Sequence, residues 1–373
     1  MTLPRVAAFT DTYLPTVNGV TYTVRTWRDR WEQRGGRMDV VYPESDHDPA
    51  ATEHPVGSIP FPFYDGFRVG LPSVPDAVAN TDIVHAHTPF GIGLGALRAA
   101  RAGDRPLVAS YHTPCAEYAE YLSVNGRVKR GVRRAATGYE RWFLDHADVV
   151  VAPSERTAAH VEDVVGVDTD VTVVPNGVDT DVFAPVAGDS RARFGLPDGP
   201  LVGYTGRHGH EKQLDVLVEA VARLDREVTL VFGGDGPARG GLERLADERG
   251  VDARFLGFLD RADLPAFYDC LDVFGFPSPV ETQGLVALEA NACGTPVAGV
   301  DAGALADTIE EGETGYKAPA DDPGALAAAI ERTLDERDRL RQACLDRRDA
   351  LSVEHAVDRL ERIYREQGEC LGA

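Results

Sequence analysis

Two cationic residues follow one strand-like run in the second half of the chain. The run Leu201–Tyr204 leads into Gly206 and Arg207, and Lys212 comes five residues later, where the next helix is expected to begin. A guanidinium and an ammonium at one strand end suit a diphosphate, whose charge must be neutralised as it leaves. Because Lys212 is one of only three lysines in the chain, we interpret it as a ligand of such a group. The alternative is an ordinary solvated loop.

Two glutamates, Glu281 and Glu289, lie eight residues apart across an expected helix start. At a rise of about 1.5 Å per residue they would be roughly 12 Å apart along the axis, which approximates the span from a sugar, past a diphosphate, to a ribose. Free amides at the helix start could hold the diphosphate between them. Two surface glutamates are the alternative, which is weakened because Glu289 stands beside apolar residues. The candidate ligand-binding residues of this segment are Thr282, Gln283, Gly284, Leu285 and Glu289.

Two glycine-containing segments also stand at expected strand ends. One follows the run Val228–Phe232, where glycines would let a base or ribose approach the backbone. The other precedes an expected helix over residues 20–34, whose N-terminus offers amides to an anion. Each segment alone is also compatible with a tight turn or a plain strand–turn–helix connection. Together with the strand end described first, these segments contribute the ligand-binding candidates Asn18, Gly19, Val20, Gly206, Gly234, Gly236 and Pro237.

A histidine, His112, stands in Ser110-Tyr-His-Thr at the end of a strand-like run in the first half. At a strand end it can donate to a sugar hydroxyl or help to stabilise charge in a reaction. A lone histidine is more often structural, but the other strand-end motifs favour a functional role.

Two further patterns resemble functional motifs, but we interpret them as structural. Gly91-Ile-Gly-Leu-Gly95 resembles a dinucleotide-binding fingerprint, but its third glycine is misplaced, so we interpret it as a helix start. Asp168-Thr-Asp170 and Asp179-Thr-Asp181 resemble a metal-holding pair, but two acids underfill a metal shell. We therefore expect no metal site.

Short apolar runs alternate with helical patterns, which indicates an α/β fold of parallel sheets covered by helices. The strand-like runs are Val6–Thr10, Met38–Tyr42, Ile83–Ala86, Leu107–Tyr111, Val149–Ala152, Val171–Val174, Leu201–Tyr204, Val228–Phe232, Ala253–Leu256, Val273–Phe276 and Pro296–Gly299. An aperiodic stretch over residues 183–190 is the best linker candidate, so we predict domains over residues 1–184 and 185–352. Ligands bind outside the carboxyl ends of parallel strands, and two facing sheets would place a ligand in the cleft between them.

Composition limits the class of partner. The net charge is −22, which disfavours nucleic acid and resembles proteins from salt-rich cytoplasm; a merely acidic mesophilic protein is the alternative. The five scattered cysteines suggest neither a disulfide framework nor a zinc site. The apolar run at the N-terminus is too short for a signal peptide, and none reaches the length of a membrane span, so we expect a cytoplasmic protein.

Taken together, the motifs resemble the family-4 retaining glycosyltransferases of GT-B fold, whose two Rossmann-like domains face each other across a cleft. The resemblance implies that Arg207 and Lys212 neutralise the diphosphate of a nucleotide-sugar, Glu281 binds its sugar and Glu289 its ribose. It implies that His112 lies near the reacting carbon and that the loop at Gly19 reaches the diphosphate. The family needs no metal or other cofactor and usually retains anomeric configuration, giving an α-linkage. Its last helix returns to the first domain, which here implies residues 353–373.

The resemblance implies a lipid or a glycan as the acceptor, and two features favour a lipid. Gln283 and the segment Phe61–Arg68 look like those of diacylglycerol glucosyltransferases. Residues 127–134 carry five cations and no acid, which could dock on anionic headgroups at the inner face of the cell membrane. A basic helix face paired with acids elsewhere is the alternative. The five cations of this membrane patch are Arg127, Lys129, Arg130, Arg133 and Arg134.

Two other functions share this architecture. A nucleotide-sugar epimerase would convert its donor without an acceptor, and a non-catalytic nucleotide-sugar-binding subunit would bind without turnover. The presence of Arg207, Lys212 and both glutamates argues against the latter. Base contacts in this fold are largely to backbone, so the motifs do not distinguish UDP from GDP, nor one hexose from another.

Overall fold

The computed structural model describes residues 2–16, 18–60, 68–112, 114–115 and 126–370. The chain forms two compact units: residues 1–176 with 353–373, and residues 177–352. The unit boundary therefore precedes the predicted one at residue 184. The predicted linker, residues 183–190, lies inside the second unit, because the fully buried Phe183 belongs to its core.

The first unit is built on a parallel sheet with the strand order β3-β2-β1-β6-β7-β8-β9. A small antiparallel pair, β4 with β5, stands beside it. The strands are β1 (Arg5–Phe9), β2 (Arg37–Pro43), β3 (Glu53–Val56), β4 (Ser58–Pro60), β5 (Arg68–Gly70), β6 (Ile83–Ala86), β7 (Leu107–Ser110), β8 (Val149–Ala152) and β9 (Val171–Val173).

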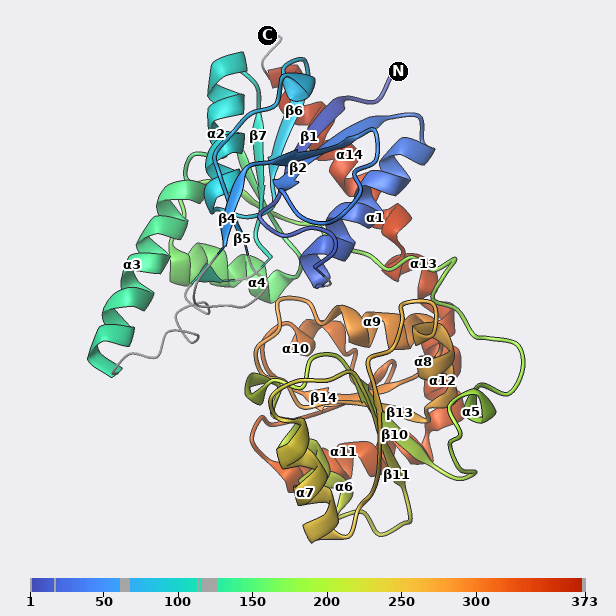
Figure 1. The fold of residues 1–373 in the computed structure, drawn as a ribbon. Helices are drawn as coiled ribbons and strands as arrows, with labels where there is room; N and C mark the ends of the chain where they lie inside the picture. The colour runs from blue at the N-terminus through green and yellow to red at the C-terminus, as the bar shows by residue number, and fades with distance from the viewer. Residues whose placement is uncertain (1, 17, 61–67, 113, 116–125, 371–373) are drawn as a thin grey trace. The chain divides into compact units, whose positions relative to one another are not determined.

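Helices cover both faces of this sheet (Figure 1). Alternate residues of β1 point to opposite faces: Val6 and Ala8 join one hydrophobic cluster with α1 and α14, whereas Ala7 and Phe9 join another with α2 and α3. The helices are α1 (Gly19–Gln33), α2 (Gly91–Gly103), α3 (Gly126–Leu144), α4 (Glu155–Ala159), which a π-helical turn over His160–Val165 extends, and α14 (Val353–Cys370), besides a short 3₁₀ turn over Asp76–Val78.

The last helix, α14, returns to the first unit and lies beside α1 (Figure 1). The ring of Tyr364 packs edge-on against Trp31 with centroids 5.3 Å apart. Arg34 forms ion pairs with Glu354 and Asp358. This is the arrangement that the family resemblance implies for residues 353–373.

The second unit is built on a parallel sheet with the order β12-β11-β10-β13-β14-β15. Its strands are β10 (Leu201–Thr205), β11 (Thr229–Gly233), β12 (Asp252–Gly257), β13 (Val273–Phe276), β14 (Val297–Val300) and β15 (Gly315–Ala318). Its helices are α5 (Ser190–Arg193), α6 (Leu214–Val221), α7 (Arg239–Arg249), α8 (Leu264–Cys270), α9 (Leu285–Ala292), α10 (Leu305–Thr308), α11 (Pro323–Asp335), α12 (Arg337–Asp346) and α13 (Arg348–Leu351), and a 3₁₀ turn spans His210–Lys212.

The predicted strands coincide with β1, β2, β6–β9 and β10–β14 within one or two residues. Four strands were not predicted: β3, whose Glu53-His-Pro-Val sequence is polar and contains proline, the short pair β4 and β5, and β15. The predicted helix 20–34 is α1. Its bounds, Gly19–Gln33, differ from the predicted ones by one residue at each end.

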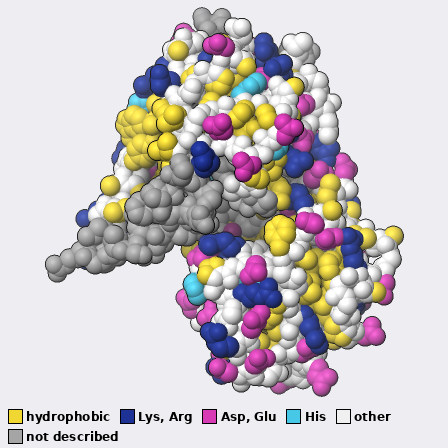
Figure 2. Space-filling view, in the orientation of Figure 1, with side chains coloured by type: hydrophobic (Ala, Val, Ile, Leu, Met, Phe, Trp, Pro, Cys, Tyr) yellow, Lys and Arg dark blue, Asp and Glu magenta, His cyan; other side chains and the backbone are white. Residues whose placement is uncertain are grey.

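Charged side chains of both signs intermingle over the visible face of each unit (Figure 2). Among the described helices, none combines the length and apolarity that a bilayer span requires. Four cysteines, Cys115, Cys270, Cys293 and Cys344, are buried free thiols.

Candidate donor and acceptor sites

A lysine and a glutamate from two different strand ends meet in the second unit. Lys212 follows β10, and Glu281 lies between β13 and α9. Lys212 Nζ donates to Glu281 Oε1 at 2.6 Å, and both side chains are mostly but not fully buried. The structure therefore brings together two residues that the sequence analysis assigned to the diphosphate and to the sugar.

Arg207 belongs to the same charged cluster. Its guanidinium forms an ion pair with Glu211, one turn along the loop. The phenol of Tyr204, buried beneath, has its pKa raised by burial first, then by the carboxylates Glu281 and Glu211, whereas Arg207 acts in the opposite direction. Arg207 and Lys212 are both carried by the loop that follows β10, and each forms an ion pair with a carboxylate.

The glycine-rich loops after β10 and β11 pack directly on each other. A Cβ on Gly234 would lie 2.0 Å from the carbonyl oxygen of Gly206, and a Cβ on Gly236 would lie 2.6 Å from that of His208. The amide of Gly206 donates to Gly233 O at 3.2 Å. This close approach of the two loops requires glycine at both positions, and Pro237 is exposed.

Helix α9 begins at Leu285, directly after Gly284, whose φ of +73° is readily adopted only by glycine. A Cβ there would also approach Leu305 Cδ2 to 2.8 Å. Gln283 is buried, and its carbonyl accepts from Thr308 Oγ1 at 2.6 Å, which anchors the helix start; Thr282 is partly buried.

The carboxylate of Glu289 lies in the interior of the second unit. Tyr268 donates to Glu289 Oε2 at 2.9 Å, and Arg261 to Oε1 at 3.2 Å. Burial raises the pKa of Glu289, although Arg261 and Tyr268 act against that rise. Neither partner was expected from the sequence, because no spacing links Arg261 or Tyr268 to the helix that carries Glu289.

In the first unit, His112 follows β7 and lies among buried aromatic rings. His112 Nε2 is 3.1 Å from His87 Nδ1, and the two rings are stacked with centroids 5.4 Å apart. Burial lowers the pKa of His112 to about 4, so this imidazole is neutral at physiological pH. Thr113, the last residue of the motif, lies outside the described residues.

The segment before α1 has a structural role in helix capping. Asn18 Oδ1 accepts from the amide of Thr21 at 2.9 Å, which is the usual N-cap arrangement. Gly19 is the first, exposed residue of the helix, and Val20 packs against the core. Asn18 Nδ2 also donates to Thr12 Oγ1 at 2.8 Å, so the side chain ties the helix start to the loop after β1.

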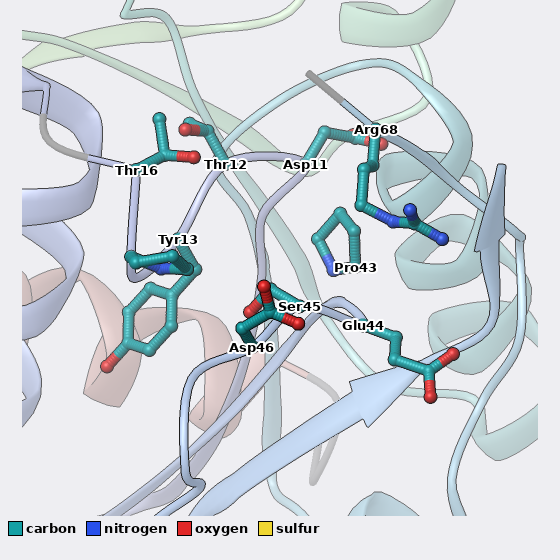
Figure 3. Close-up of a pocket in the computed structure, with 10 residues that line it drawn as sticks. Asp11, Thr12, Tyr13, Thr16, Pro43, Glu44, Ser45, Asp46 and Arg68 are labelled. Carbon is teal, nitrogen blue, oxygen red and sulfur yellow. The ribbon is translucent and has the colours of Figure 1, made fainter. Parts of the chain in front are cut away.

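A hollow of about 460 Å³ opens beside this segment, within the first unit (Figure 3). The loops after β1 and β2 line it with hydroxyl and carboxylate groups, and Arg68 adds one cation. Burial raises the pKa of one lining carboxyl, Asp11, to about 6, against hydrogen bonds from Ile92, Thr88 and neighbouring amides. The lining residues are Asp11, Thr12, Tyr13, Pro15, Thr16, Pro43, Glu44, Ser45, Asp46 and Arg68.

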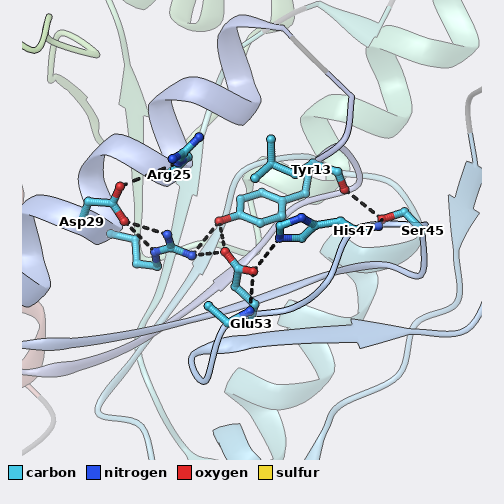
Figure 4. A network of polar contacts seen from close by, with 9 residues as sticks. Tyr13, Arg25, Asp29, Ser45, His47 and Glu53 are labelled. Carbon is cyan, nitrogen blue, oxygen red and sulfur yellow. Dashed lines mark hydrogen bonds and ion pairs between the residues drawn. The ribbon is translucent and has the colours of Figure 1, made fainter. Parts of the chain in front are cut away.

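A buried polar network supports one wall of the hollow (Figure 4). Tyr13 donates to Glu53 Oε1 at 2.8 Å, and Arg28, from α1, pairs with the same carboxylate. His47 and the amide of Ala50 contact Glu53 Oε2 at 2.8 and 2.9 Å. The network fixes the loop after β1 against α1 and β3. No sequence pattern indicated this network, and the polar strand β3, which carries Glu53, was itself not predicted.

Helix α3 presents the cations of the membrane patch. Arg130, Arg133 and Arg134 are exposed. Arg127 and Lys129 lie on the same helix, but their side chains are outside the described part of the structure.

The glycine pattern at residue 91 and the two Asp-Thr-Asp sequences have local structural roles. Gly91 begins α2, as interpreted from the sequence. Asp168 forms an ion pair with Arg141 at 2.9 Å, and Asp179 accepts from the amide of Asp181. The described residues contain no group of three acidic, histidine or cysteine side chains arranged to hold a metal ion.

Family models match both units. The model of Glycosyltransferase Family 4 matches residues 17–182, and that of Glycosyl transferases group 1 matches residues 188–347.

Three characterised relatives are similar along much of the chain. A GDP-mannose-dependent alpha-mannosyltransferase of Mycolicibacterium smegmatis is 34% identical over 90% of each chain. A 2-deoxystreptamine glucosyltransferase of Streptomyces kanamyceticus is 36% identical, over only 64% of each chain, which is just under two thirds of that protein. An alpha-monoglucosyldiacylglycerol synthase of Streptococcus pneumoniae is 28% identical over 79% of this chain and 70% of its own.

Among solved structures, sucrose-phosphate synthase of Thermosynechococcus elongatus has the same fold. It superposes with a TM-score of 0.79 at 24% identity over 97% of this chain and 98% of its own. The parallel sheets of the two units are thus those of a GT-B fold. Family models match both units, and the mannosyltransferase of Mycolicibacterium smegmatis matches over nine tenths of its length. The chain therefore belongs to the family-4 glycosyltransferases and is a glycosyltransferase that uses a nucleotide-sugar donor.

Proposed function

We propose that the enzyme transfers a hexose from a nucleotide-sugar to a hydroxyl of a membrane lipid, with retention of anomeric configuration and formation of an α-linkage. The observation that carries this proposal is the charged cluster of the second unit, in which Lys212 contacts Glu281 and Arg207 lies close by. The cluster provides two cations for a diphosphate after β10 and a carboxylate for a sugar after the adjacent strand β13.

Each residue of the cluster would exchange its partner when the donor binds. The diphosphate would replace Glu211 on Arg207 and share Lys212 with Glu281, because a charged phosphate oxygen is a stronger acceptor for both cations. Glu281 would then accept from hydroxyls of the transferred hexose. Glu289, partnered by Tyr268 and Arg261, keeps lone pairs for the ribose hydroxyls.

Retention is proposed from the family resemblance, and within the described residues the cluster offers no carboxylate suited to forming a covalent glycosyl intermediate. Both acids there, Glu211 and Glu281, are in ion pairs with cations, which reduces their nucleophilicity. We therefore favour attack by the acceptor on the face from which the diphosphate departs. His112 would stabilise charge near the reacting carbon.

The hollow of the first unit is our proposed acceptor site. Its lining contains the acids Asp11, Glu44 and Asp46 against one cation, Arg68, together with several hydroxyl groups. This composition suits an uncharged hydroxyl-bearing head, such as that of a diacylglycerol, better than a phosphate.

Association with the inner face of the membrane is proposed from helix α3. Arg130, Arg133 and Arg134 are exposed there, and Trp142 of the same helix is 43% exposed. Cations with an amphipathic aromatic residue are typical of helices that lie on anionic lipid surfaces. The name of the pneumococcal relative also refers to a glycolipid. The proposal further implies that no divalent metal is required.

The test begins with the donor. Thermal-shift measurements with UDP- and GDP-sugars should identify one that stabilises the protein. That donor is then incubated with vesicles containing diacylglycerol, in buffer with a chelator, and the product is analysed by NMR. An α-linked glycolipid supports the proposal. A β-linked product, donor conversion without an acceptor, or activity that requires added metal would each contradict the corresponding part.

A further inference from the structure

Three histidines of the first unit form a buried stack beneath Trp27. The centroids of His85 and His87 are 4.1 Å apart, and those of His87 and His112 are 5.4 Å apart. The ring of Trp27 lies 5.7 Å from that of His87 and 6.4 Å from that of His112. All three histidines are buried, so the proton on each ring must be placed by the hydrogen bonds that the stack allows.

The outer histidine of the stack, His85, has both nitrogens occupied. His85 Nδ1 is 2.6 Å from the hydroxyl of Tyr364, and His85 Nε2 is 2.8 Å from Ser110 Oγ. His85 therefore stacks against His87 without offering it a hydrogen bond.

The middle histidine, His87, has one partnered nitrogen and one unpartnered nitrogen. Its Nδ1 is 3.1 Å from His112 Nε2. Its Nε2 is buried and has no hydrogen-bond partner among the described residues. Burial lowers the pKa of both His87 and His112, so both rings are neutral and a single proton lies between Nδ1 and Nε2.

Two arrangements of that proton are possible. If His112 Nε2–H donates, His87 must carry its own proton on Nε2, where an N–H group would be buried without an acceptor. If His87 Nδ1–H donates, His87 Nε2 is a bare lone pair. Buried N–H groups without an acceptor are rarer in proteins than underused acceptors, which favours the second arrangement.

We propose that His87 is a positioning residue for His112: it donates from Nδ1 to His112 Nε2 and thereby fixes the His112 tautomer that carries its proton on Nδ1. The functional part of this inference rests on the proposed function, in which His112 faces the transferred sugar. His112 then presents an N–H donor, and not a lone pair, to a sugar oxygen.

The tautomer can be measured without any substrate. Histidine-selective ¹⁵N labelling of the full chain, with long-range ¹H–¹⁵N spectra, distinguishes protonated from unprotonated ring nitrogens. The signals of His112 are assigned by their loss in His112→Gln. We expect Nδ1 of His112 to be protonated; a proton on Nε2 overturns the proposal. This result is independent of whether the proposed reaction is correct.

Variants of His87 test the positioning role. In His87→Asn the side-chain amide occupies the place of Nδ1 and can keep the donor, whereas His87→Gln places its amide near Nε2 and His87→Leu has none. We expect Leu and Gln to lower kcat about tenfold, with KM for the donor unchanged, and Asn to restore it. Equal loss in all three variants, or an unchanged His112 tautomer in folded His87→Leu, contradicts the proposal. Thermal melting reports whether each variant is folded.

Discussion

Lys212 Nζ and Glu281 Oε1 lie 2.6 Å apart, although 69 residues separate them in the chain. Each follows a central strand of the same parallel sheet, and the strand order places β10 next to β13. Adjacent strand ends therefore bring a cation and a carboxylate into contact. The contact keeps the ammonium near the place where we propose that the diphosphate binds.

Removal of the ammonium should abolish most of the activity. We expect Lys212→Met to lower kcat by a factor on the order of 10² to 10³, because a positioned cation stabilises the leaving diphosphate in the transition state. Steady-state kinetics with the identified donor measures this. Lys317→Met is the matched control, since Lys317 bonds to Ala306 O away from the cluster. Similar rates for both variants would refute the assignment of Lys212.

Removal of the competing carboxylate should strengthen donor binding. Glu211 pairs with Arg207 in the free enzyme, and both side chains are more than a third exposed. We expect Glu211→Ala to tighten binding of the donor roughly two- to fivefold, because an exposed pair contributes only a fraction of a kcal/mol to about 1 kcal/mol. Calorimetric titration of the nucleoside diphosphate measures the change. Weaker binding would show that Glu211 supports the site.

Gly234 should tolerate no side chain. At φ +102°, Gly234→Ala would be strained, and its Cβ would meet the carbonyl oxygen of Gly206. Gly199→Ala is the control, because Gly199 has φ +109° and open space around the added Cβ. Backbone strain should lower the free energy of unfolding of both variants by about 1 kcal/mol or more. Gly234→Ala should lose clearly more stability than Gly199→Ala, and it should also lose its affinity for the donor. Chemical unfolding measures the stability of both variants, and titration with the nucleoside diphosphate measures their affinity for it. Equal losses of stability would mean that the two loops do not depend on this contact.

Acid should destabilise the first unit through Glu53. Burial would raise the pKa of Glu53, but hydrogen bonds from Ala50, His47, Tyr13 and Arg28 hold that pKa at about 2. A carboxyl with a depressed folded-state pKa stabilises the fold above its ordinary value, near 4.5, and this stabilisation is lost as the pH falls toward 2.

The pH prediction can be checked by variants. Glu53→Gln should be less stable than the parent at neutral pH, and its stability should fall less between pH 6 and 3 (about the window of the shift). Chemical unfolding at several pH values measures both effects. Glu310→Gln serves as the control, since Glu310 is exposed. Parallel pH profiles for Glu53→Gln and the parent would exclude Glu53 as the acid-sensitive group.

Vesicle binding should depend on α3. Neutralising Arg130, Arg133 and Arg134 to glutamine should weaken binding to anionic vesicles on the order of a hundredfold at low ionic strength, and salt should reduce the difference. Vesicle sedimentation measures the binding at each salt concentration. The control neutralises three other exposed arginines, Arg98, Arg101 and Arg244. Equal effects would mean that net charge, and not this helix, governs binding.

The fold was largely predictable because its signal is local. Strands buried on both faces read as short apolar runs, and β6, β8 and β13 occupy the predicted residues. The domain boundary was misplaced because proline and glycine around residues 183–190 resemble a linker. Phe183 nevertheless packs into the second core, a contact that only the folded chain reveals.

The site was predictable only in part. Lys212, Arg207 and Glu281 stand out by residue type next to strand ends, and the structure brings them into one cluster. Their partners were not foreseen, because Glu211 looks like any surface acid and Tyr268 reaches Glu289 from another helix. Similarly, nothing in the sequence pattern pairs His87 with His112. Such contacts depend on packing between distant segments.

The return of α14 to the first unit has a consequence for biosynthesis. The hydroxyl of Tyr364 is the partner of His85 Nδ1, and the same helix covers Trp31. On the ribosome, Trp31 and His85 emerge hundreds of residues before α14 is made. The first unit therefore completes its core only after the whole second unit has been synthesised. Until then, the apolar side chains that α14 covers need another form of protection from aggregation.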